Sequence, residues 1–239
     1  MMSVECASLA IKSIAKKPYF DCGKALFCSI IVLGLASGCS VIDKPTRPGM
    51  YDFGPGALSL PAGARPSVAA PDPAMPVLAV ADIVTSGGAL ENQALLYRLA
   101  YTDAQQLRPY SQARWSMPPA QLVRQRLRER LGQRRVVLNA SEGVALNRSH
   151  NASLPMLRLQ LEEFSHLFSA PDASVGLIRL HATLVNITPT GERLFGQRSF
   201  VVQRPAPSAD APGGVRALTE ATDAVIEEID AWLQQTPVR

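Results

Sequence analysis

Leu157-Arg-Leu-Gln-Leu-Glu162 and Ile178-Arg-Leu-His-Ala-Thr-Leu184 are the two stretches that decide the fold. In each one, apolar side chains alternate with polar ones, which is the period of a β-strand with one buried face and one solvated face. Residues 186–192 contain Pro and Gly, which favours a turn into a return strand over 194–203. We therefore predict a three-stranded antiparallel meander, with a bulge at Phe164, where the alternation changes phase.

Two helices are predicted to pack on this meander. Residues 118–132 begin with Pro-Pro, repeat Val or Leu every four positions from Val123, and end with Gly, which indicates a helix. Residues 215–235 carry an apolar stripe that ends at Trp232, so we expect Trp232 to pack on the sheet. Shorter strands are expected at 77–84, 95–101 and 135–139, with a turn-rich stretch at 102–116. The predicted fold class is α+β, an antiparallel sheet with two helices packed on it.

The first forty residues indicate export. Four of the five lysines lie before residue 25, and the 13 residues 25–37 carry no charge. This run is shorter than the roughly 20 residues of a membrane-spanning helix and is typical of a secretory signal. It ends in Leu35-Ala-Ser-Gly-Cys39, which resembles the bacterial lipobox, although Ala36 stands where Leu is usual. We predict a lipoprotein signal peptide at 1–38 and lipid attachment at Cys39; a plain secretory signal or a short buried helix is the alternative.

A Pro-rich tether is predicted between Cys39 and the folded domain. Residues 40–76 contain eight Pro residues, and this composition favours extended backbone at roughly 3.1 Å per residue. Such a segment would hold the domain tens of ångströms from the membrane. Tyr51-Asp-Phe53 interrupts it with alternation and is a candidate edge strand. The predicted organisation is a signal peptide at 1–38, a lipidated Cys and tether at 39–75, and a domain at 76–236.

Charge and cysteine usage exclude two classes of protein. Removal of residues 1–38 lowers the net charge from +4 to +2, because four Lys leave together with Glu5 and Asp21. A domain this weakly basic is not expected to bind nucleic acid. The mature chain keeps Cys39 alone, so neither a disulfide framework nor a cysteine-based metal site is expected.

No motif in the sequence points to catalysis. His150, His166 and His181 lack the spacing of a zinc site, and each is expected to be solvated or hydrogen-bonded. A Gly-x-Ser-x-Gly nucleophile elbow does not occur. The adjacent pair Glu162-Glu163 would point to opposite faces of a strand, and Gly213-Gly214 lacks the lysine of a phosphate-binding loop and indicates a helix-entry loop. We therefore expect no enzyme, no metal and no cofactor.

Two sets of residues are candidates for a partner interface. Tyr110 and Trp115 are of a kind enriched at interfaces, although sealing the core is the alternative for them. The two predicted helices carry opposite charge, which suits pairing between neighbouring subunits or with a partner protein; solvated faces and contact with anionic lipid headgroups are the alternatives. The candidate charged residues are Arg124, Arg128, Arg130, Glu220, Glu227 and Glu228.

A series of features follows a defined order along the mature chain. It consists of Cys39 in a lipobox, Tyr51-Asp-Phe, Tyr97-Arg-Leu, Tyr110 and Trp115 before Pro118-Pro119, an Arg-rich helix, the strand triplet and a final Trp232-Leu233. This order resembles the ABC-type transport auxiliary lipoproteins. The resemblance implies a subunit of an MCE-type lipid transport system, in which an MCE-domain protein connects across the periplasm to an ABC permease and ATPase. It also implies docking of that MCE-domain protein at the outer membrane, as a homo-oligomer.

The residue after the lipobox bears on the location. Ser40 follows Cys39, where Asp would favour retention in the inner membrane, so we expect an outer-membrane anchor with the domain facing the periplasm. A rival function suits the Pro-rich tether equally well. In that rival, the lipoprotein reaches from the outer membrane through the peptidoglycan and regulates a cell-wall synthase.

Overall fold

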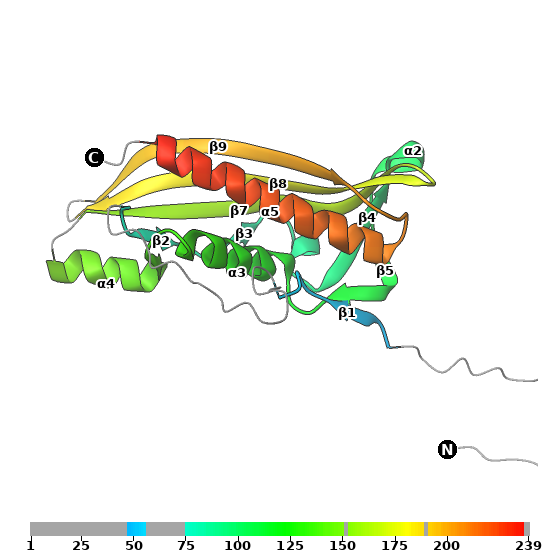
Figure 1. Ribbon diagram of the computed structural model, residues 1–239, viewed down its shortest axis with the longest axis horizontal. Coiled ribbons are helices and arrows are strands. Elements are labelled where there is room, and N and C mark those ends of the chain that lie inside the picture. The colour runs from blue at the N-terminus through cyan, green and yellow to red at the C-terminus, as the bar shows by residue number, and fades with distance from the viewer. Residues whose placement is uncertain (1–46, 56–74, 151–152, 189–190, 237–239) are drawn as a thin grey trace, which may run out of the picture. The chain divides into compact units, whose positions relative to one another are not determined.

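Three long antiparallel strands form the centre of the structure. The computed structural model describes residues 47–55, 75–150, 153–188 and 191–236. The predicted signal peptide, Cys39 and most of the predicted tether lie outside these residues. The three central strands are β7 (Leu154–Ala170), β8 (Ala173–Thr188) and β9 (Gly191–Pro205), paired in that order (Figure 1). The predicted meander is confirmed, and its strands are longer than the apolar alternation suggested.

The predicted bulge is also confirmed. The register between β7 and β8 shifts between Leu161 and Glu163, just before Phe164. Because one extra residue is inserted there, Phe164 returns to the buried face that Leu159 and Leu161 occupy. The shift therefore keeps the core side of a 17-residue strand continuous.

The remaining strands make the sheet mixed rather than antiparallel. They are β1 (Gly49–Tyr51), β2 (Leu78–Val80), β3 (Val84–Thr85), β4 (Ala94–Leu99), β5 (Ala104–Trp115) and β6 (Val137–Asn139). Strands β2, β3 and β4 each run parallel to β7, β1 runs parallel to β5, and β6 runs parallel to β2. The α+β class is confirmed, but the parallel pairs correct the expected all-antiparallel sheet. Among the described strands, β9 forms one edge, while β1 and β6 lie on the other side of β7.

Strand β5 replaces the turn-rich stretch expected at 102–116. It is a 12-residue strand that pairs with β4 and with β1. Most of its residues are exposed, and only Ala113 and Trp115 are buried. Since the strand lies near a sheet edge with little buried surface, it shows no apolar alternation. That is why its sequence looked like a loop.

Helices α3 (Pro119–Gly132) and α5 (Ala211–Gln235) cover one face of the sheet (Figure 1). The first matches its predicted bounds, and the second starts four residues before the predicted 215. Asp210 accounts for the earlier start, because its side chain caps the helix by accepting a hydrogen bond from the backbone N–H of Gly213 at 2.8 Å. Bonds from Ser208 and from this N–H hold the pKa of Asp210 below its usual range. Three short or unpredicted helical segments complete the fold: η2 (Gly88–Leu90), α2 (Ala100–Asp103) and α4 (Ala140–His150).

Gly213-Gly214 lies in the first turn of α5, which corrects the expected helix-entry loop. Glycine is required at 214 by close packing, because a Cβ there would lie 2.4 Å from Nδ1 of His166. Gly176 of β8 allows a second close approach, since its Cβ would lie 2.5 Å from the backbone of Ala217. The N-terminal half of α5 therefore sits directly on the backbone of the sheet.

The main core contains an aromatic cluster that includes a residue of the predicted tether. Phe53 packs edge-on against Trp115, with ring centroids 5.6 Å apart, and lies 6.2 Å from Phe164. Trp115 and Phe164 are 5.6 Å apart and both are fully buried. The edge strand predicted at Tyr51-Asp-Phe53 is confirmed only in part, because β1 spans Gly49–Tyr51 and shares Tyr51 with it. Residues 49–53 nevertheless pack as part of the folded domain, although the tether was predicted to span 39–75.

Trp232 packs against the sheet as expected, but it is only partly buried. Its ring meets Phe200 of β9 edge-on, with centroids 6.0 Å apart. The ring also lies over Gly196 of β9, where a Cβ would be in ordinary van der Waals contact with it at 3.5 Å. Trp232 thus covers the end of the core. Because its ring is only partly buried, it contributes less to stability than a fully buried Trp side chain would.

Replacing Phe53 with Ala tests whether the β1 segment is structural. We expect the free energy of unfolding to fall by about 3–5 kcal/mol, because removal of a large buried aromatic side chain leaves a cavity beside Trp115 and Phe164. Chemical denaturation measures the change. Met50→Ala is the matched control on the same strand, since Met50 is 63% exposed. Equal stability of the two variants would contradict the structural role.

Candidate functional site

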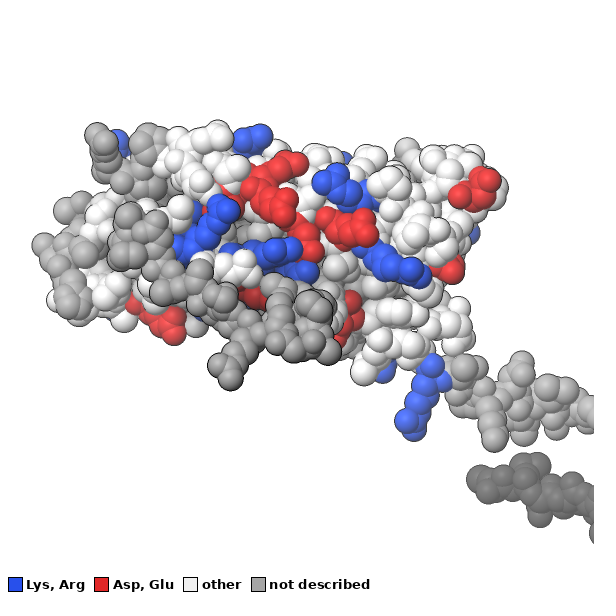
Figure 2. Space-filling view, viewed as in Figure 1, with Lys and Arg blue, Asp and Glu red and all other residues white. Residues whose placement is uncertain are grey.

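The charged faces of α3 and α5 meet each other within one chain (Figure 2). Arg126 of α3 donates two hydrogen bonds to Asp223 of α5, from Nε at 2.7 Å and from Nη2 at 2.8 Å. Asp230, two turns further along α5, accepts hydrogen bonds from Arg134 and Arg135, each at 3.0 Å. Asp223 and Asp230 of α5 are therefore bound by arginines of α3 and of the turn that follows it, and we call this set of contacts the interhelical clasp.

Burial makes the first of these contacts important for stability. The side chain of Arg126 is 8% exposed, and that of Asp223 is 23% exposed. The hydrogen bond to Asp223 raises the pKa of Arg126, so this guanidinium remains charged inside the interface. Loss of either partner would leave a charge without compensation in a poorly solvated place. The clasp thus fixes the position of α3 relative to α5.

The clasp changes the role of the predicted interface arginines. Arg130 lies 3.6 Å from Asp223 of the same chain. Arg128 donates to Oδ1 of Asn139 at 2.6 Å, and Arg124 pairs with Asp82. All three arginines therefore have a polar contact within the chain and remain partly exposed. Their pairing with a neighbouring subunit's acidic helix stays a prediction.

The acidic residues of the predicted interface have no such contacts in the described part of the chain. Glu220, Glu227 and Glu228 are exposed on α5 and form no ion pair with any residue that the structure describes. They lie on the same helix as Asp223 and Asp230, which face α3. This row of three glutamates, which we call the acidic ridge, is the part of the predicted charged interface that remains accessible.

The two predicted aromatic interface residues have different environments. Trp115 is fully buried in the core, so it cannot contact a partner, and the alternative of sealing the core is the correct one. Tyr110 is half-buried, and its hydroxyl lies 2.8 Å from Nδ1 of His166. Both side chains come from β5, which positions them from the edge of the sheet.

Tyr110 belongs to a buried polar chain beneath the start of α5. His166 is fully buried, and its Nε2 lies 2.7 Å from Oγ of Ser174. Burial lowers the pKa of His166 to about 4, and burial also raises the pKa of the Tyr110 hydroxyl. Both ring nitrogens of a neutral His166 are therefore partnered, as the sequence led us to expect. The chain satisfies polar groups within the core.

The other histidines do not gather around this one. His181 lies on the opposite face of β8, where its Nδ1 is 3.0 Å from Oγ of Ser199. His150 ends α4, although the sequence suggested a polar loop. Within the described part of the chain, no group of three His, Cys, Asp or Glu residues has the arrangement of a metal site.

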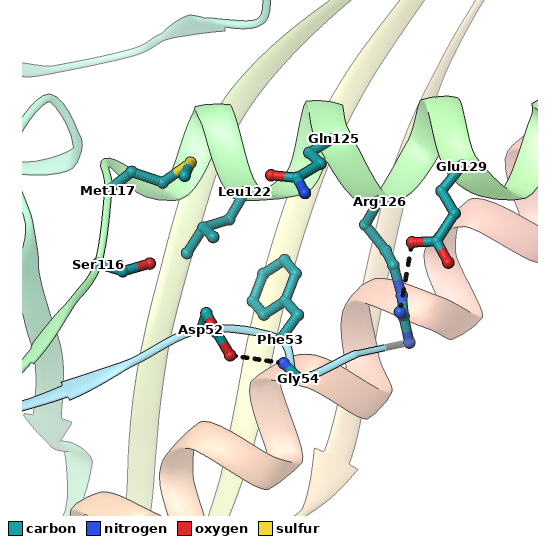
Figure 3. A pocket seen from close by; sticks show the side chains of 9 residues that line it. All are labelled: Asp52, Phe53, Gly54, Ser116, Met117, Leu122, Gln125, Arg126 and Glu129. Atoms are coloured by element: carbon teal, nitrogen blue, oxygen red, sulfur yellow. Dashed lines mark hydrogen bonds and ion pairs between the residues drawn. The ribbon is translucent and has the colours of Figure 1, made fainter. Parts of the chain in front are cut away.

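A small cavity lies where the β1 segment meets α3 (Figure 3). In Figure 3, the ring of Phe53 lies below Leu122, and Arg126 extends beside Glu129. Asp52 turns back to accept a hydrogen bond from the backbone N–H of Gly54 at 2.8 Å. The cavity volume of about 150 Å³ is below the roughly 300–1,000 Å³ of small-molecule sites. This junction is therefore a packing joint with little room for a ligand.

A larger and more apolar surface lies between β6 and α4. It is an open groove of about 510 Å³ lined by Val77, Val136, Leu138, Ala145 and Leu146, with Glu142 and Ser149 at its rim. We call it the α4 groove. Val136 is 47% exposed, which is unusual for a valine next to a strand. Apolar surface rimmed by polar residues is typical of a binding surface.

Sequence reasoning missed this groove because it missed α4. Residues 140–150 contain Ser, Glu, Gly, Asn and Arg, and their apolar positions are too few for a clear period. One signal was present. Asn139 and Glu142 have the spacing of a capping box, and the backbone N–H of Asn139 donates to Oε2 of Glu142 at 2.7 Å.

Residues 58–230 match the family described as ABC-type transport auxiliary lipoprotein component. The chain belongs to this family. The match extends from the segment after β1 almost to the end of α5, so it covers every described strand except β1, both covering helices and the α4 groove. No curated protein sequence matches the chain. None of the helices in the described ranges combines the length and the hydropathy that a bilayer crossing needs.

Solved structures support the fold. Protein XCC0632 from Xanthomonas campestris is 21% identical, with a TM-score of 0.53; the match covers 68% of this chain and 88% of that one. At this identity the likeness shows the fold alone. Lipoprotein GNA1162 from Neisseria meningitidis is 14% identical over 66% of this chain and 99% of its own, with a TM-score of 0.28.

The buried histidine predicts how stability depends on pH. The pKa of His166 is about 4 in the folded protein and near 6.5 when unfolded. The unfolded chain therefore binds more protons between these values, so stability falls as pH drops from about 6.5 to 4, by up to about 3 kcal/mol. We expect His166→Gln to remove this contribution and flatten the dependence. Urea denaturation at several pH values measures it, and an unchanged slope would contradict the assignment.

Proposed function

We propose that the protein is a non-enzymatic auxiliary subunit of an MCE/ABC-type lipid transport system. In this proposal, a lipid on Cys39 anchors it to the outer membrane, and the domain faces the periplasm. Family membership supports the link to ABC transport and the lipoprotein character. The MCE-domain protein, and through it the permease and ATPase, are the proposed partners. The domain acts by docking and assembly.

The observation that carries this proposal over its rival is the position of β1. The strand begins at Gly49, ten residues after Cys39, and ten residues of extended chain span at most about 35 Å. The tether expected from sequence would have reached about 110 Å at 3.1 Å per residue. A domain held this close to its anchor suits docking at the membrane surface. It does not suit a regulator that must extend through the cell wall.

The proposed assembly is a homo-oligomer that uses apolar contacts. A closed ring needs two different surfaces on each copy. The α4 groove lies beside β6 on one side of β7, and β9 at the opposite edge of the sheet exposes Leu194 and Val201. We propose that the β9 edge of one copy lies in the groove of the next. The acidic ridge then remains free for a basic surface of the MCE-domain partner.

Paired cysteines test the proposed ring contact. The proposed mature chain has no other free thiol, because Cys39 is lipidated and the other cysteines leave with the signal peptide. Val136→Cys combined with Val201→Cys should give a ladder of covalent oligomers under mild oxidation in cells, read on a non-reducing gel. Met50→Cys combined with Val201→Cys is the control, since Met50 lies at neither surface. A single monomer band for the first pair would contradict this contact.

Crosslinking and pull-down from cells test the proposed function. We expect an MCE-domain protein among the captured partners and its loss when Cys39→Ala removes the anchor. The same variant should lose labelling by a clickable fatty acid, which checks lipidation separately. Reversal of the acidic ridge to Lys should reduce capture without changing lipidation. Capture of a penicillin-binding protein in place of an MCE-domain protein would support the rival function.

A further inference from the structure

We propose that the sheet edge formed by β1 and β5 lies on the membrane surface, with Arg47 and Arg114 on anionic lipid headgroups. This inference rests on the proposed lipidation of Cys39. It adds an orientation to the proposed function, since it states which part of the domain faces the bilayer. The occupant of this edge is the membrane that holds the acyl chains.

The geometry of the edge leaves its side chains accessible. β1 pairs with β5 on one side, with Met50 beside Arg114 and Gly49 beside Ala113, and no other described strand pairs with β1. Met50 is 63% exposed, the largest exposure among the large apolar residues that the structure describes. Nη2 of Arg114 lies 3.8 Å from Sδ of Met50, so a basic and an apolar side chain project together.

The edge formed by β1 and β5 is basic. Arg47, Arg108 and Arg114 lie in the segments 47–55 and 104–115, and the only carboxylate in these segments is that of Asp52. Asp52 is directed to the backbone N–H of Gly54, and Arg108 bonds Gln106. The edge therefore carries a net charge of +2, and Figure 2 shows basic side chains at this end of the domain. A guanidinium group donates two parallel hydrogen bonds to the oxygens of a phosphate, which suits anionic lipid headgroups.

Chain length favours the membrane over a protein as the occupant. The residues that enter β1 are those that follow the anchor, so this edge is the part of the domain with the shortest covalent path to Cys39. The α4 groove and the β9 edge are reached only through longer stretches of folded chain. The chain between the acyl groups and this basic edge spans at most about 35 Å. The edge therefore meets anionic headgroups at a high effective concentration. Met50 adds an apolar side chain at the height of the interface.

Depth-sensitive quenching on the intact lipoprotein tests the orientation. The full mature lipoprotein, with a fluorophore on Met50→Cys, is inserted into vesicles of phosphatidylcholine and phosphatidylglycerol that carry a headgroup-level quencher. The control carries the fluorophore on Val201→Cys, which is similarly exposed at 54% but lies on β9. We expect at least threefold stronger quenching at position 50. Equal quenching at both positions would overturn the proposal.

A second set of variants separates lipid binding from simple tethering. Twenty Gly/Ser residues inserted after Ser40 lengthen the chain between the anchor and β1. With this insertion, we expect quenching at position 50 to persist on anionic vesicles. Adding Arg47→Ala and Arg114→Ala should then lower that quenching at least twofold. Loss of quenching on lengthening alone would show that the edge has no affinity for lipid and would overturn the headgroup contact. Fatty-acid labelling of each variant is measured in parallel. Absent labelling means that the proposed anchor has failed, whereas labelling without preferential quenching means that only the orientation has failed.

Discussion

The packing of Phe53 against both Trp115 and Phe164 is the contact on which the rest of the structure depends. It joins the first described residues of the chain to the sheet and places them against α3, where Asp52 and Gly54 line the small cavity. Because the aromatic core is completed by a residue so close to Cys39, the fold itself limits how far the domain can stand from a lipid anchor. The packing of Phe53 therefore links the fold to the distance between the domain and the proposed lipid anchor.

The interhelical clasp explains why charge is a poor guide to the partner surface in this protein. Arg126 and Asp223 use opposite charges to hold two helices of one chain together, and the buried chain through His166 similarly satisfies polar groups inside the core. What remains on the outside is the acidic ridge, the α4 groove and the basic β1–β5 edge. In our proposals, the acidic ridge meets a protein partner, the α4 groove meets another copy of the chain, and the β1–β5 edge meets the membrane.

Much of this fold was predictable from sequence where one face of an element is buried. The alternation in β7 and β8 and the Leu repeat of α3 gave those elements, the bulge near Phe164 included, because burial imposes a period on the side chains. β5 and α4 were missed since edge elements bury too little to show one. The pairing of Arg126 with Asp223 and the depth of Trp115 depend on contacts distant in sequence, so neither could be predicted from spacing. Gly214 is a similar case, because its need for glycine comes from His166.

Hydrogen–deuterium exchange of the intact lipoprotein in membranes tests most directly whether the β1 segment belongs to the folded domain. Peptides covering residues 49–53 are compared with peptides of β5 and of the central strand β7. We expect exchange of the β1 amides to be slowed to a degree similar to that of β5, because the strand is hydrogen-bonded to β5 and held by Phe53. Complete exchange of 49–53 within seconds, with β5 still protected, would contradict it and would restore a long tether.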